Sequence, residues 1–447
     1  MSLIPAFIRR RISHRPSLIR IAENISWLFF DKVLRMSVGL FVGIWIARYL
    51  GPEQFGILSY AMAFSGLFGA LAALGLNGVV VRDIVRDPAN ASLTLGSAAV
   101  LQLIGGLVSF LIMLAAISIL RADDPLARSI VAILGAMMLL KASEVAAYWF
   151  ESQVLSKYTV WVQSSAFIIF SLVKVYLILA QAPLLTFAWA MLVEAIVVAV
   201  VLLTVLSRNG VALSSLSAST QRARSLLADS WPLAISAIAI TVYMKIDQIM
   251  LGQMIGDEAV GIYSAAVQIS VLWYFVPVAI SNSVLPSLIE SRQRSVVQYN
   301  ERLKKLYELV VVLSFAVAIP FTFLATPIIH LLFGAAYAGA GAVLAIHIWA
   351  SVFVSLGVAS NHWFLAENRP MLNLQRTILG ALVNVALNLW LIPLYGMTGA
   401  AIATVFSQAT AAWLYDALHP ATRAMFLVKT AAMNPFRMLK KQSHRGD

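Results

Sequence analysis

The sequence predicts an all-α integral membrane protein with twelve transmembrane helices in two parallel six-helix lobes. Hydrophobic residues make up 61% of its 447 residues and charged residues only 12%, whereas soluble domains average roughly 45–50% and 25%. Its apolar runs are long enough to cross a bilayer as helices, which takes about 20 residues each. One segment also occurs twice, as LGPEQFGILSYA at 50–61 and as IGDEAVGIYSAA at 255–266. Such an internal repeat is common in transporter folds.

Apolar runs bounded by charges, Pro and Gly predict the helices in chain order. In the first lobe they lie near 22–49, 55–79, 92–120, 127–150, 158–180 and 184–206. In the second lobe they lie near 230–253, 259–286, 306–331, 339–364, 372–393 and 396–418. The domains are then an N-terminal lobe at 1–207 with a basic lead-in at 1–21, a linker at 208–229, a C-terminal lobe at 230–418 and a basic tail at 419–447. Because six is even, both lobes enter the membrane in the same direction, so the repeat is parallel.

Lysine and arginine are distributed unevenly between alternate loops. Of the 32 such residues, 24 fall on the side of both termini, three on the opposite side and five within predicted spans. Basic loops mark the cytoplasmic side, so both termini are expected in the cytoplasm and both copies of the repeated turn outside. There Glu53 and Glu258 are expected to cap or brace the turn. The tail is expected to lie on the inner leaflet as an amphipathic segment.

Composition and motifs exclude several function classes. The chain has no cysteine and six histidines, and no histidines have the spacing of a catalytic zinc site. There is no GxxxxGK(S/T) loop for a nucleoside triphosphate. The net charge of +12 is concentrated beside predicted spans, which indicates anionic lipid as a partner and argues against nucleic acid. No catalytic residue, metal or cofactor is predicted, and energy is expected from an ion gradient or the membrane potential.

Nine ionisable residues lie inside predicted spans, where each costs about 2.5–3.5 kcal/mol and usually faces the bundle interior or a wet cavity. The basic residues, predicted to bind substrate in a cationic cavity, are Lys32, Arg35, Lys141, Lys174 and Lys245. The acidic residues, predicted to couple ions or balance charge, are Asp31, Glu144, Glu194 and Asp247. The basic surplus favours an anionic substrate such as a phosphate or pyrophosphate headgroup.

Spacing on the helices leaves alternatives open for the first lobe. Asp31 and Arg35 are four residues apart and can pair, while the same cluster with Lys32 either snorkels to the headgroups or faces a cavity. Lys141 and Glu144 are three apart, so they form either a self-neutralised buried pair or a functional one.

The four remaining charges raise a different question, because none of them can form an ion pair within its own helix. Lys174 has no acid on its own helix and pairs either with Glu194 on the next helix or with a ligand, and Glu194 serves either that pair or proton coupling. Lys245 and Asp247 are two apart and point to nearly opposite sides. Four amide residues in spans are expected to form interhelical hydrogen bonds first and ligand contacts second: Asn282, Asn384, Asn388 and Gln408. His347 and His362 are expected to be hydrogen-bonded interior or interfacial residues and not proton carriers.

Three stretches resemble a known family: ARYLGPEQFGILSYA (47–61) with LGLNGVVVRD (74–83), KIDQIMLGQMIGDEAVGIYSAA (245–266), and IPLYGMTGAAIATVFSQ (392–408). In order and spacing they are similar to the polysaccharide-unit (O-antigen, Wzx-like) flippases of the multidrug/oligosaccharidyl-lipid/polysaccharide exporter superfamily. The resemblance implies a MATE-like bundle that moves an undecaprenyl-pyrophosphate-linked oligosaccharide to the outer leaflet of the bacterial inner membrane, by ion-coupled alternating access. It also implies that Lys32, Arg35, Lys174 and Lys245 meet the headgroup and that Asp247 matches the acid of the family's seventh-helix motif. A polysaccharide polymerase and a chain-length regulator are candidate partners.

Two other function classes compete with a flippase. A cation-coupled exporter of drugs or small molecules could use the same fold, but it calls for an acidic or apolar cavity, and the basic surplus counts against it. A membrane enzyme such as a polymerase or ligase needs a large external loop with catalytic groups. The predicted external loops are short and hold only three basic residues, which disfavours that class.

Overall fold

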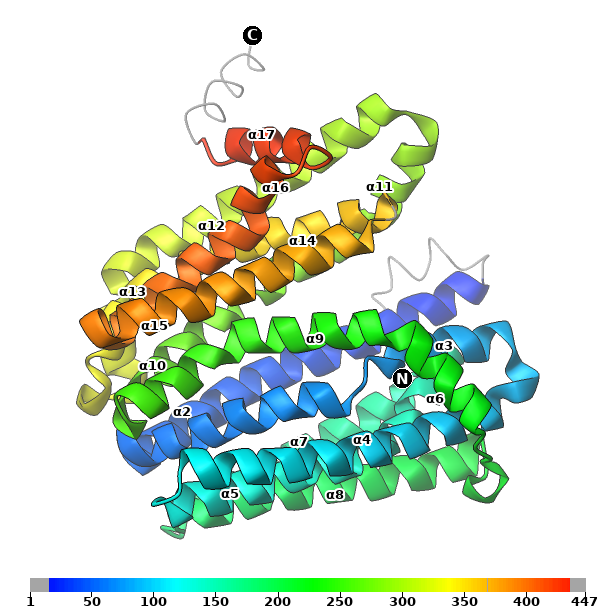
Figure 1. The fold of residues 1–447 in the computed structure, drawn as a ribbon, viewed down its shortest axis with the longest axis horizontal. Coiled ribbons are helices and arrows are strands. Elements are labelled where there is room, and N and C mark those ends of the chain that lie inside the picture. The colour runs from blue at the N-terminus through cyan, green and yellow to red at the C-terminus, as the bar shows by residue number, and fades with distance from the viewer. Residues whose placement is uncertain (1–15, 368, 435–447) are drawn as a thin grey trace. The chain divides into compact units, whose positions relative to one another are not determined.

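The computed structural model describes residues 16–367 and 369–434, and the described chain is helical with no strand. The earlier elements are α2 (Pro16–Ala72), α3 (Leu76–Arg86), η1 (Pro88–Asn90), α4 (Ala91–Leu120), α5 (Pro125–Gly135), η2 (Ala136–Glu144), α6 (Val145–Ser152), α7 (Lys157–Leu179), α8 (Leu184–Asn209), η3 (Leu213–Ser215) and α9 (Thr220–Met254). The later ones are α10 (Asp257–Leu272), α11 (Phe275–Arg294), α12 (Val296–Phe333), η4 (Ala335–Tyr337), α13 (Ala340–His347), α14 (Ala350–Ala366), α15 (Pro370–Ala409), the π-helical η5 (Thr410–Leu414), α16 (Tyr415–Leu418) and α17 (Arg423–Ala432). Figure 1 shows this course.

Ten helical segments of the described chain are long and apolar enough to cross a membrane. Two of them, 23–86 with 64 residues and 370–418 with 49 residues, are more than twice the roughly 20 residues that one crossing needs. Each contains a glycine with a non-helical, positive φ, 71° at Gly51 and 59° at Gly396. Dividing both segments at these glycines gives twelve segments, which agrees with the predicted all-α membrane bundle.

The chain forms two compact units, and their boundary departs from the domains predicted from sequence. One unit comprises the chain up to Leu50 together with Tyr60–Thr241, and the other comprises Gly51–Ser59 together with the chain from Val242. The boundary therefore lies inside α9, whereas the sequence prediction placed 208–229 in the linker and began the C-terminal lobe at 230. The predicted lead-in at 1–21 lies outside the residues whose side chains the structure describes.

The repeated sequence segment is repeated in structure as well, and its glycines explain why. Gly51 and Gly256 both have positive φ, 71° and 129°, where L-residues with a side chain are strained. Within the second unit, a Cβ on Gly56 would lie 1.7 Å from the carbonyl oxygen of Asp257, and one on Gly261 would lie 1.9 Å from that of Pro52. Each copy thus packs its second glycine against the backbone of the other copy.

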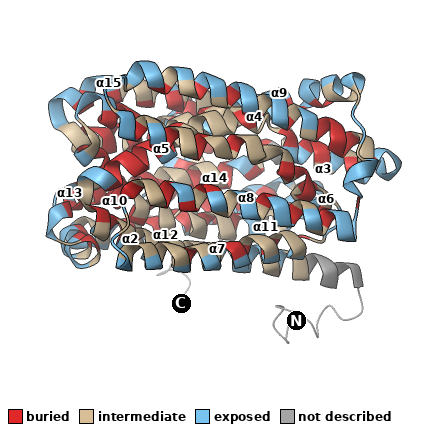
Figure 2. Ribbon diagram, turned by 90° about the horizontal axis from the view of Figure 1, so that it is seen from below, coloured by how far each residue is buried: buried red, intermediate tan, exposed pale blue. Residues whose placement is uncertain are grey.

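Large apolar side chains face outward over much of the bundle. The exposed fractions of Ile119, Leu179 and Phe323 are 80%, 78% and 77%, and exposed positions recur along α8, α9 and α15 (Figure 2). In water such a surface would be unstable, but in a bilayer the solvent itself is apolar and only the backbone must be satisfied internally, as helices do. This surface confirms a multi-pass membrane protein.

The start of the tail packs into the second unit instead of resting on lipid. Met425 and Ala432 of α17 are buried in the core of that unit with Tyr307. The Nζ of Lys429 lies 2.5 Å from a carboxylate oxygen of Asp416, and both side chains are 0% exposed. Burial lowers the pKa of Lys429 to about 8. The expected surface segment is therefore wrong for α17, while 435–447 lie outside the described residues.

Candidate functional site

The first charged cluster of the first unit is internally paired. Arg35 donates from Nε to Asp31 at 2.8 Å, and Ser164 of α7 donates to the same carboxylate at 2.6 Å. The guanidinium of Arg35 lies 5.0 Å from the ring centroid of Phe167, within range of a cation–π interaction. These contacts fix Arg35 between α2 and α7. One of its terminal nitrogens is buried without a hydrogen-bond partner.

Lys174 and Glu194 form an ion pair between α7 and α8. Their Nζ–Oε2 distance is 2.8 Å, and the two side chains are 13% and 17% exposed. An ion pair in low dielectric neutralises both charges and offsets part of the cost of burying them. Of the alternatives left open by the sequence, the structure therefore shows Lys174 paired with Glu194. A role of either residue in substrate binding or ion coupling stays a prediction.

Lys32 differs from its neighbours because it is exposed and makes no hydrogen bond or ion pair with any described residue. It follows Asp31 directly, yet that carboxylate is taken by Arg35 and Ser164. A lysine within a span without a carboxylate partner reaches either headgroups or an anion.

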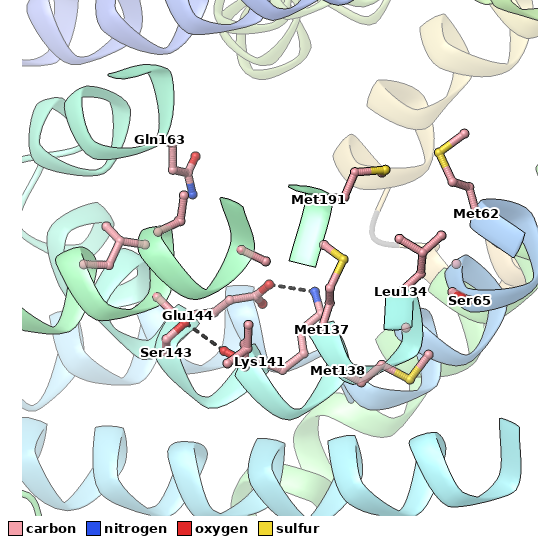
Figure 3. Close-up of a pocket in the computed structure, with 17 residues that line it drawn as sticks. Met62, Ser65, Leu134, Met137, Met138, Lys141, Ser143, Glu144, Gln163 and Met191 are labelled. Carbon is pink, nitrogen blue, oxygen red and sulfur yellow. Dashed lines mark hydrogen bonds and ion pairs between the residues drawn. The ribbon is translucent and has the colours of Figure 1, made fainter. Parts of the chain in front are cut away.

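Lys141 and Glu144 pair on the 3₁₀ helix η2. The Nζ–Oε1 distance is 2.6 Å, and Tyr148 donates to the other carboxylate oxygen at 3.3 Å. Tyr148 in turn accepts from the buried Gln102 of α4 at 2.8 Å. The pair lies at the edge of a cavity of about 370 Å³ inside the first unit (Figure 3). Of the five predicted cations, Lys141 alone lines this cavity.

Asp247 of α9 is the most enclosed charged group among the predicted site residues. Its carboxylate accepts from Tyr263 at 2.7 Å and from Asn388 at 2.6 Å, and also from Thr404 at short range. These donors come from α10 and from both halves of α15, so three chain segments converge on one carboxylate. Asp247 is only 4% exposed. No lysine or arginine of the described chain forms an ion pair with it.

The surroundings of Asp247 supply further oxygen atoms. Asn388 also donates to the side-chain oxygen of Asn384 at 3.2 Å, while its own side-chain oxygen is buried without a partner. A small cavity of about 10 Å³ adjoins Asp247, Gln248, Tyr263 and Thr404, close to the ~10–15 Å³ that one water molecule requires. One carboxylate, amide oxygens and hydroxyls are the ligands that hard cations prefer.

Transition-metal chemistry has no comparable site in the described chain. No group of three or more His, Cys, Asp or Glu residues gathers there. The Asp247 surroundings fit a proton or a monovalent hard cation, because they hold a single negative charge among neutral oxygens.

Lys245 lies two residues before Asp247 and makes no hydrogen bond or ion pair with any described residue. The two side chains therefore have different surroundings, as the two-residue spacing predicts. Among the nine charges predicted inside spans, three cations are paired with carboxylates, all four carboxylates are engaged, and Lys32 and Lys245 have no counter-charge.

Sequence reasoning missed two of the three donors to Asp247. Asn388 was expected to hydrogen-bond between helices, and it does, but Tyr263 and Thr404 were not singled out. Both lie in stretches that the sequence marks: Tyr263 in the second copy of the repeat and Thr404 in the last of the stretches that resemble the family, 392–408. Hydroxyl residues are frequent in membrane helices, so only their position opposite an acid would have identified them.

Other expectations for polar residues have mixed outcomes. His347 is buried and its Nδ1 lies 2.9 Å from the hydroxyl of Ser270, as expected of an interior histidine. His362 instead has a buried Nε2 without a partner. Glu53 and Glu258 are exposed. The N-cap residue of α10 is Gly256, and no side chain forms a capping hydrogen bond at this end of the helix. The expectation that these glutamates brace the turn is therefore wrong: the glycine contacts hold it.

A family model and one relative match the sequence. The model described as "Polysaccharide biosynthesis protein" matches residues 21–292. The relative is the protein named "Probable low-salt glycan biosynthesis flippase Agl15" of Haloferax volcanii, which is 23% identical over 388 residues, covering 83% of this chain and 77% of its own length.

Solved structures share the fold at low sequence identity. An inward-facing multidrug-resistance MATE transporter of the MOP superfamily is 18% identical, with a TM-score of 0.72 over 92% of this chain and 96% of its own. The lipid II flippase MurJ in an inward closed conformation is 15% identical, with a TM-score of 0.72 over 92% of this chain and 90% of its own. At these identities the likeness shows that the chain shares the all-α membrane fold of these transporters.

Proposed function

Because the chain belongs to the polysaccharide biosynthesis protein family, we propose that it is a flippase for a lipid-linked oligosaccharide. The substrate is an oligosaccharide repeat unit on undecaprenyl pyrophosphate, and its destination is the outer leaflet of the bacterial inner membrane. There it serves the synthesis of a surface polysaccharide such as O-antigen or exopolysaccharide. The relative from Haloferax volcanii, named as a probable glycan biosynthesis flippase, supports this class of substrate.

The observation that carries the proposal is the charge left over inside the predicted spans. Every carboxylate there is engaged, whereas Lys32 and Lys245 have no counter-charge among the described residues. An uncompensated ammonium group in low dielectric is costly unless an anion meets it. A pyrophosphate headgroup supplies that anion, and a cationic drug does not.

Transport requires the two lobes to alternate between an inward-open and an outward-open state while the substrate is bound. The headgroup binds both states through the same lysines without strongly favouring either, because a ligand shifts an equilibrium only by its difference in affinity. The lipid tail remains in apolar surroundings throughout. The protein contributes no covalent chemistry, so it acts as a secondary transporter.

Asp247 couples this transport to a proton or a monovalent cation. Its support is the convergence of Tyr263, Asn388 and Thr404 on one buried carboxylate, beside the partnerless oxygen of Asn388. Acids buried in membrane spans mark ion pathways. Binding of a cation neutralises the carboxylate and ties α9 to α15, which changes the relative stability of the two states.

The substrate proposal is tested by neutralising the two unpaired lysines. A strain lacking this protein is complemented with Lys245→Gln, Lys32→Gln or the exposed control Lys305→Gln. Loss of one charge-assisted contact to a phosphate weakens binding by about tenfold or more, so both site variants lose surface polysaccharide and accumulate lipid-linked repeat units. Normal polysaccharide in Lys32→Gln and Lys245→Gln cells, or a changed drug susceptibility alone, contradicts the proposal.

The coupling proposal is tested with Asp247→Asn in proteoliposomes. Substrate movement in the wild type responds to an imposed sodium or pH gradient, whichever ion is coupled. Asp247→Asn cannot bind the cation electrostatically, so its transport no longer responds to the gradient. The control is Asp257→Asn, which neutralises an acid at the start of α10 that does not contact the Asp247 site. A gradient response retained by Asp247→Asn would exclude this carboxylate from coupling.

A further inference from the structure

The cavity in the first unit is large enough to hold part of a ligand. Its volume is about 370 Å³, within the ~300–1,000 Å³ typical of small-molecule sites. Residues of α2, α5, η2, α7 and α8 line it, all from one compact unit. Figure 3 shows the labelled side chains around it, with the Lys141–Glu144 pair at one edge.

The lining of this cavity is apolar and adaptable. Four methionines contribute to it: Met62, Met137, Met138 and Met191. Methionine is flexible and polarizable, so it packs around irregular apolar ligands. Among the described residues no aromatic side chain lines the cavity, and the polar residues that do are Ser65, Lys141, Ser143, Glu144 and Gln163. The rest of the lining is apolar, and an irregular hydrocarbon chain fits it.

The wall bearing two of these methionines is held in an unusual backbone conformation. Nine residues, Ala136–Glu144, form the 3₁₀ helix η2 within an otherwise apolar α-helical segment; such long mid-helix 3₁₀ stretches are uncommon and often functional. Behind this wall, a Cβ on Gly106 would lie 2.3 Å from the carbonyl oxygen of Met138. The backbone of α4 thus supports η2 directly.

Lys141, at the polar edge of the cavity, can release Glu144 while that carboxylate keeps another hydrogen-bond donor. Lys141 and Glu144 are 28% and 38% exposed, so their charged ends remain open to the cavity. If the ammonium of Lys141 turns to another anion, Glu144 retains the hydroxyl of Tyr148, which the buried Gln102 holds in place. An apolar chain ending in a phosphate matches this combination of a methionine lining and a releasable lysine.

We propose that this cavity binds the phosphate-proximal isoprene units of the polyprenyl carrier, with Lys141 contacting the adjacent phosphate. The site rests on the proposed function for the identity of the lipid. Branched isoprene units require an irregular apolar surface, which the four methionines provide. Saturated acyl chains of the bilayer are the competing occupant, and the experiment separates the two.

Two glycines allow the cavity to be filled without disturbing the backbone. Gly66 and Gly69 line it, and a Cβ added to either meets nothing within 4 Å. Gly66→Leu and Gly69→Leu therefore place a side chain inside the cavity. The matched control is Gly78→Leu on α3, where an added Cβ also meets nothing within 4 Å and which does not line the cavity.

The test is photo-crosslinking of the purified full-length protein with farnesyl pyrophosphate carrying a diazirine on its chain, followed by peptide mapping. In the wild type and in Gly78→Leu, labels are expected within 134–144 and 191–202. In Gly66→Leu and Gly69→Leu, labelling at those segments falls about tenfold or more because the added side chain occupies the apolar volume. Thermal unfolding verifies that each variant is folded, and the two filling variants serve as replicates if one is not.

Two results overturn the proposal. One is labelling that stays at wild-type level in both filling variants or maps elsewhere in every protein. The other is competition by unlabelled dodecyl pyrophosphate as strong as that by farnesyl pyrophosphate, which identifies a general acyl-chain site. Because the crosslinking experiment measures no transport, either result leaves the flippase proposal standing. Normal export by Lys32→Gln and Lys245→Gln would instead refute the flippase proposal and would not change the crosslinking result.

Discussion

At the scale of single residues, Lys174 shows how structure changes the meaning of a charge. From sequence it is a lysine in mid-span with no acid on its own helix, which makes it a ligand candidate. In the structure Glu194 of the next helix neutralises it at 2.8 Å. A buried pair of this kind is stable only while both partners are present, because removing one leaves an uncompensated charge.

This pairing predicts that Lys174 and Glu194 respond to mutation as a unit. Lys174→Met leaves Glu194 buried and unpaired, which costs about 3–5 kcal/mol, so abundance and thermal stability in detergent fall. The double variant Lys174→Met/Glu194→Leu recovers most of that loss, since apolar replacement of a buried pair is often neutral. Unfolding temperatures of the four proteins in the cycle measure the effect.

Export by the double variant decides whether the pair has more than a structural role. If the pair is structural, the double variant transports normally once it is stable. A stable double variant without export would instead show that Lys174 or Glu194 meets the substrate or the coupling ion; for Lys174, the resemblance implies a contact with the headgroup.

The Asp247 site shows which part of a site is readable from sequence. A lone acid in a membrane span is conspicuous because burying it is costly, so Asp247 could be identified. Its partners Tyr263 and Thr404 are ordinary hydroxyl residues whose roles depend on how α10 and α15 are rotated about their axes. Hydropathy locates a helix along the chain and does not set that rotation, so these partners could not be predicted.

At the scale of elements, the crossing of the two repeat copies depends on two glycines. A methyl group on Gly56 or on Gly261 would overlap a carbonyl oxygen of the opposite copy, at 1.7 and 1.9 Å. Backbone atoms on both sides cannot move aside as a flexible side chain can. We therefore expect Gly56→Ala and Gly261→Ala each to destabilise the second unit by about 1–3 kcal/mol or more.

Thermal unfolding in detergent measures this loss, and Gly66→Ala is the control. Gly66 is also helical, but an added Cβ there meets nothing within 4 Å, and alanine favours the helix by about 0.5–1 kcal/mol. Unchanged stability of both Gly56→Ala and Gly261→Ala would show that the copies do not cross at these glycines.

The docking of α17 depends on a fully buried pair between Lys429 and Asp416, which the sequence does not reveal. The tail is basic with scattered apolar residues, a pattern that favours a segment on anionic lipid. The carbonyl oxygen of Ala412 and the carboxylate of Asp416 instead accept from the ammonium at 2.7 and 2.5 Å. Tertiary partners of this kind cannot be inferred from composition.

The lowered pKa of Lys429 predicts a pH dependence of this docking. Burial lowers the pKa to about 8 from its ordinary value of 10.5, so between these pH values the unfolded chain binds more protons than the folded one. Stability of docked α17 therefore rises as pH increases from about 8 to about 10.4 and is flat below that window. Hydrogen exchange of peptide 423–432, corrected for intrinsic rates, measures this gain.

The double variant Lys429→Met/Asp416→Asn is the control for this pH dependence, because it removes the titrating amine and the carboxylate together. Its α17 exchange is expected to show no such rise. A rise of equal size in the double variant would show that groups other than Lys429 and Asp416 cause the pH dependence.

At the scale of the whole molecule, the fold was largely predictable because the bilayer restricts it. Every spanning segment must satisfy its own backbone, so apolar runs of about 20 residues identify helices directly. The same rule gives no information about packing. It therefore predicted neither the unit boundary inside α9 nor the membership of Gly51–Ser59 in the second unit. Both depend on close contacts of glycines and linker residues that hydropathy does not register.

The parallel repeat makes a prediction about sidedness that this chain is well suited to test. It has no cysteine, so any single cysteine introduced is labelled without background. Glu53 and Glu258 are exposed at corresponding turns of the two copies, and the charge asymmetry predicts that both lie outside. A membrane-impermeant maleimide is therefore expected to label Glu53→Cys and Glu258→Cys in intact cells, and the exposed linker variant Ser214→Cys only after permeabilisation.

The pattern across these three variants distinguishes the possible arrangements. Six spans separate the two turns, so both are accessible from one side only if the number of crossings between them is even. Labelling of Glu53→Cys but not Glu258→Cys in intact cells would require an odd number and an inverted repeat. Labelling of Ser214→Cys alone would keep the parallel repeat and reverse the whole protein in the membrane, which would place the basic loops outside against the positive-inside rule.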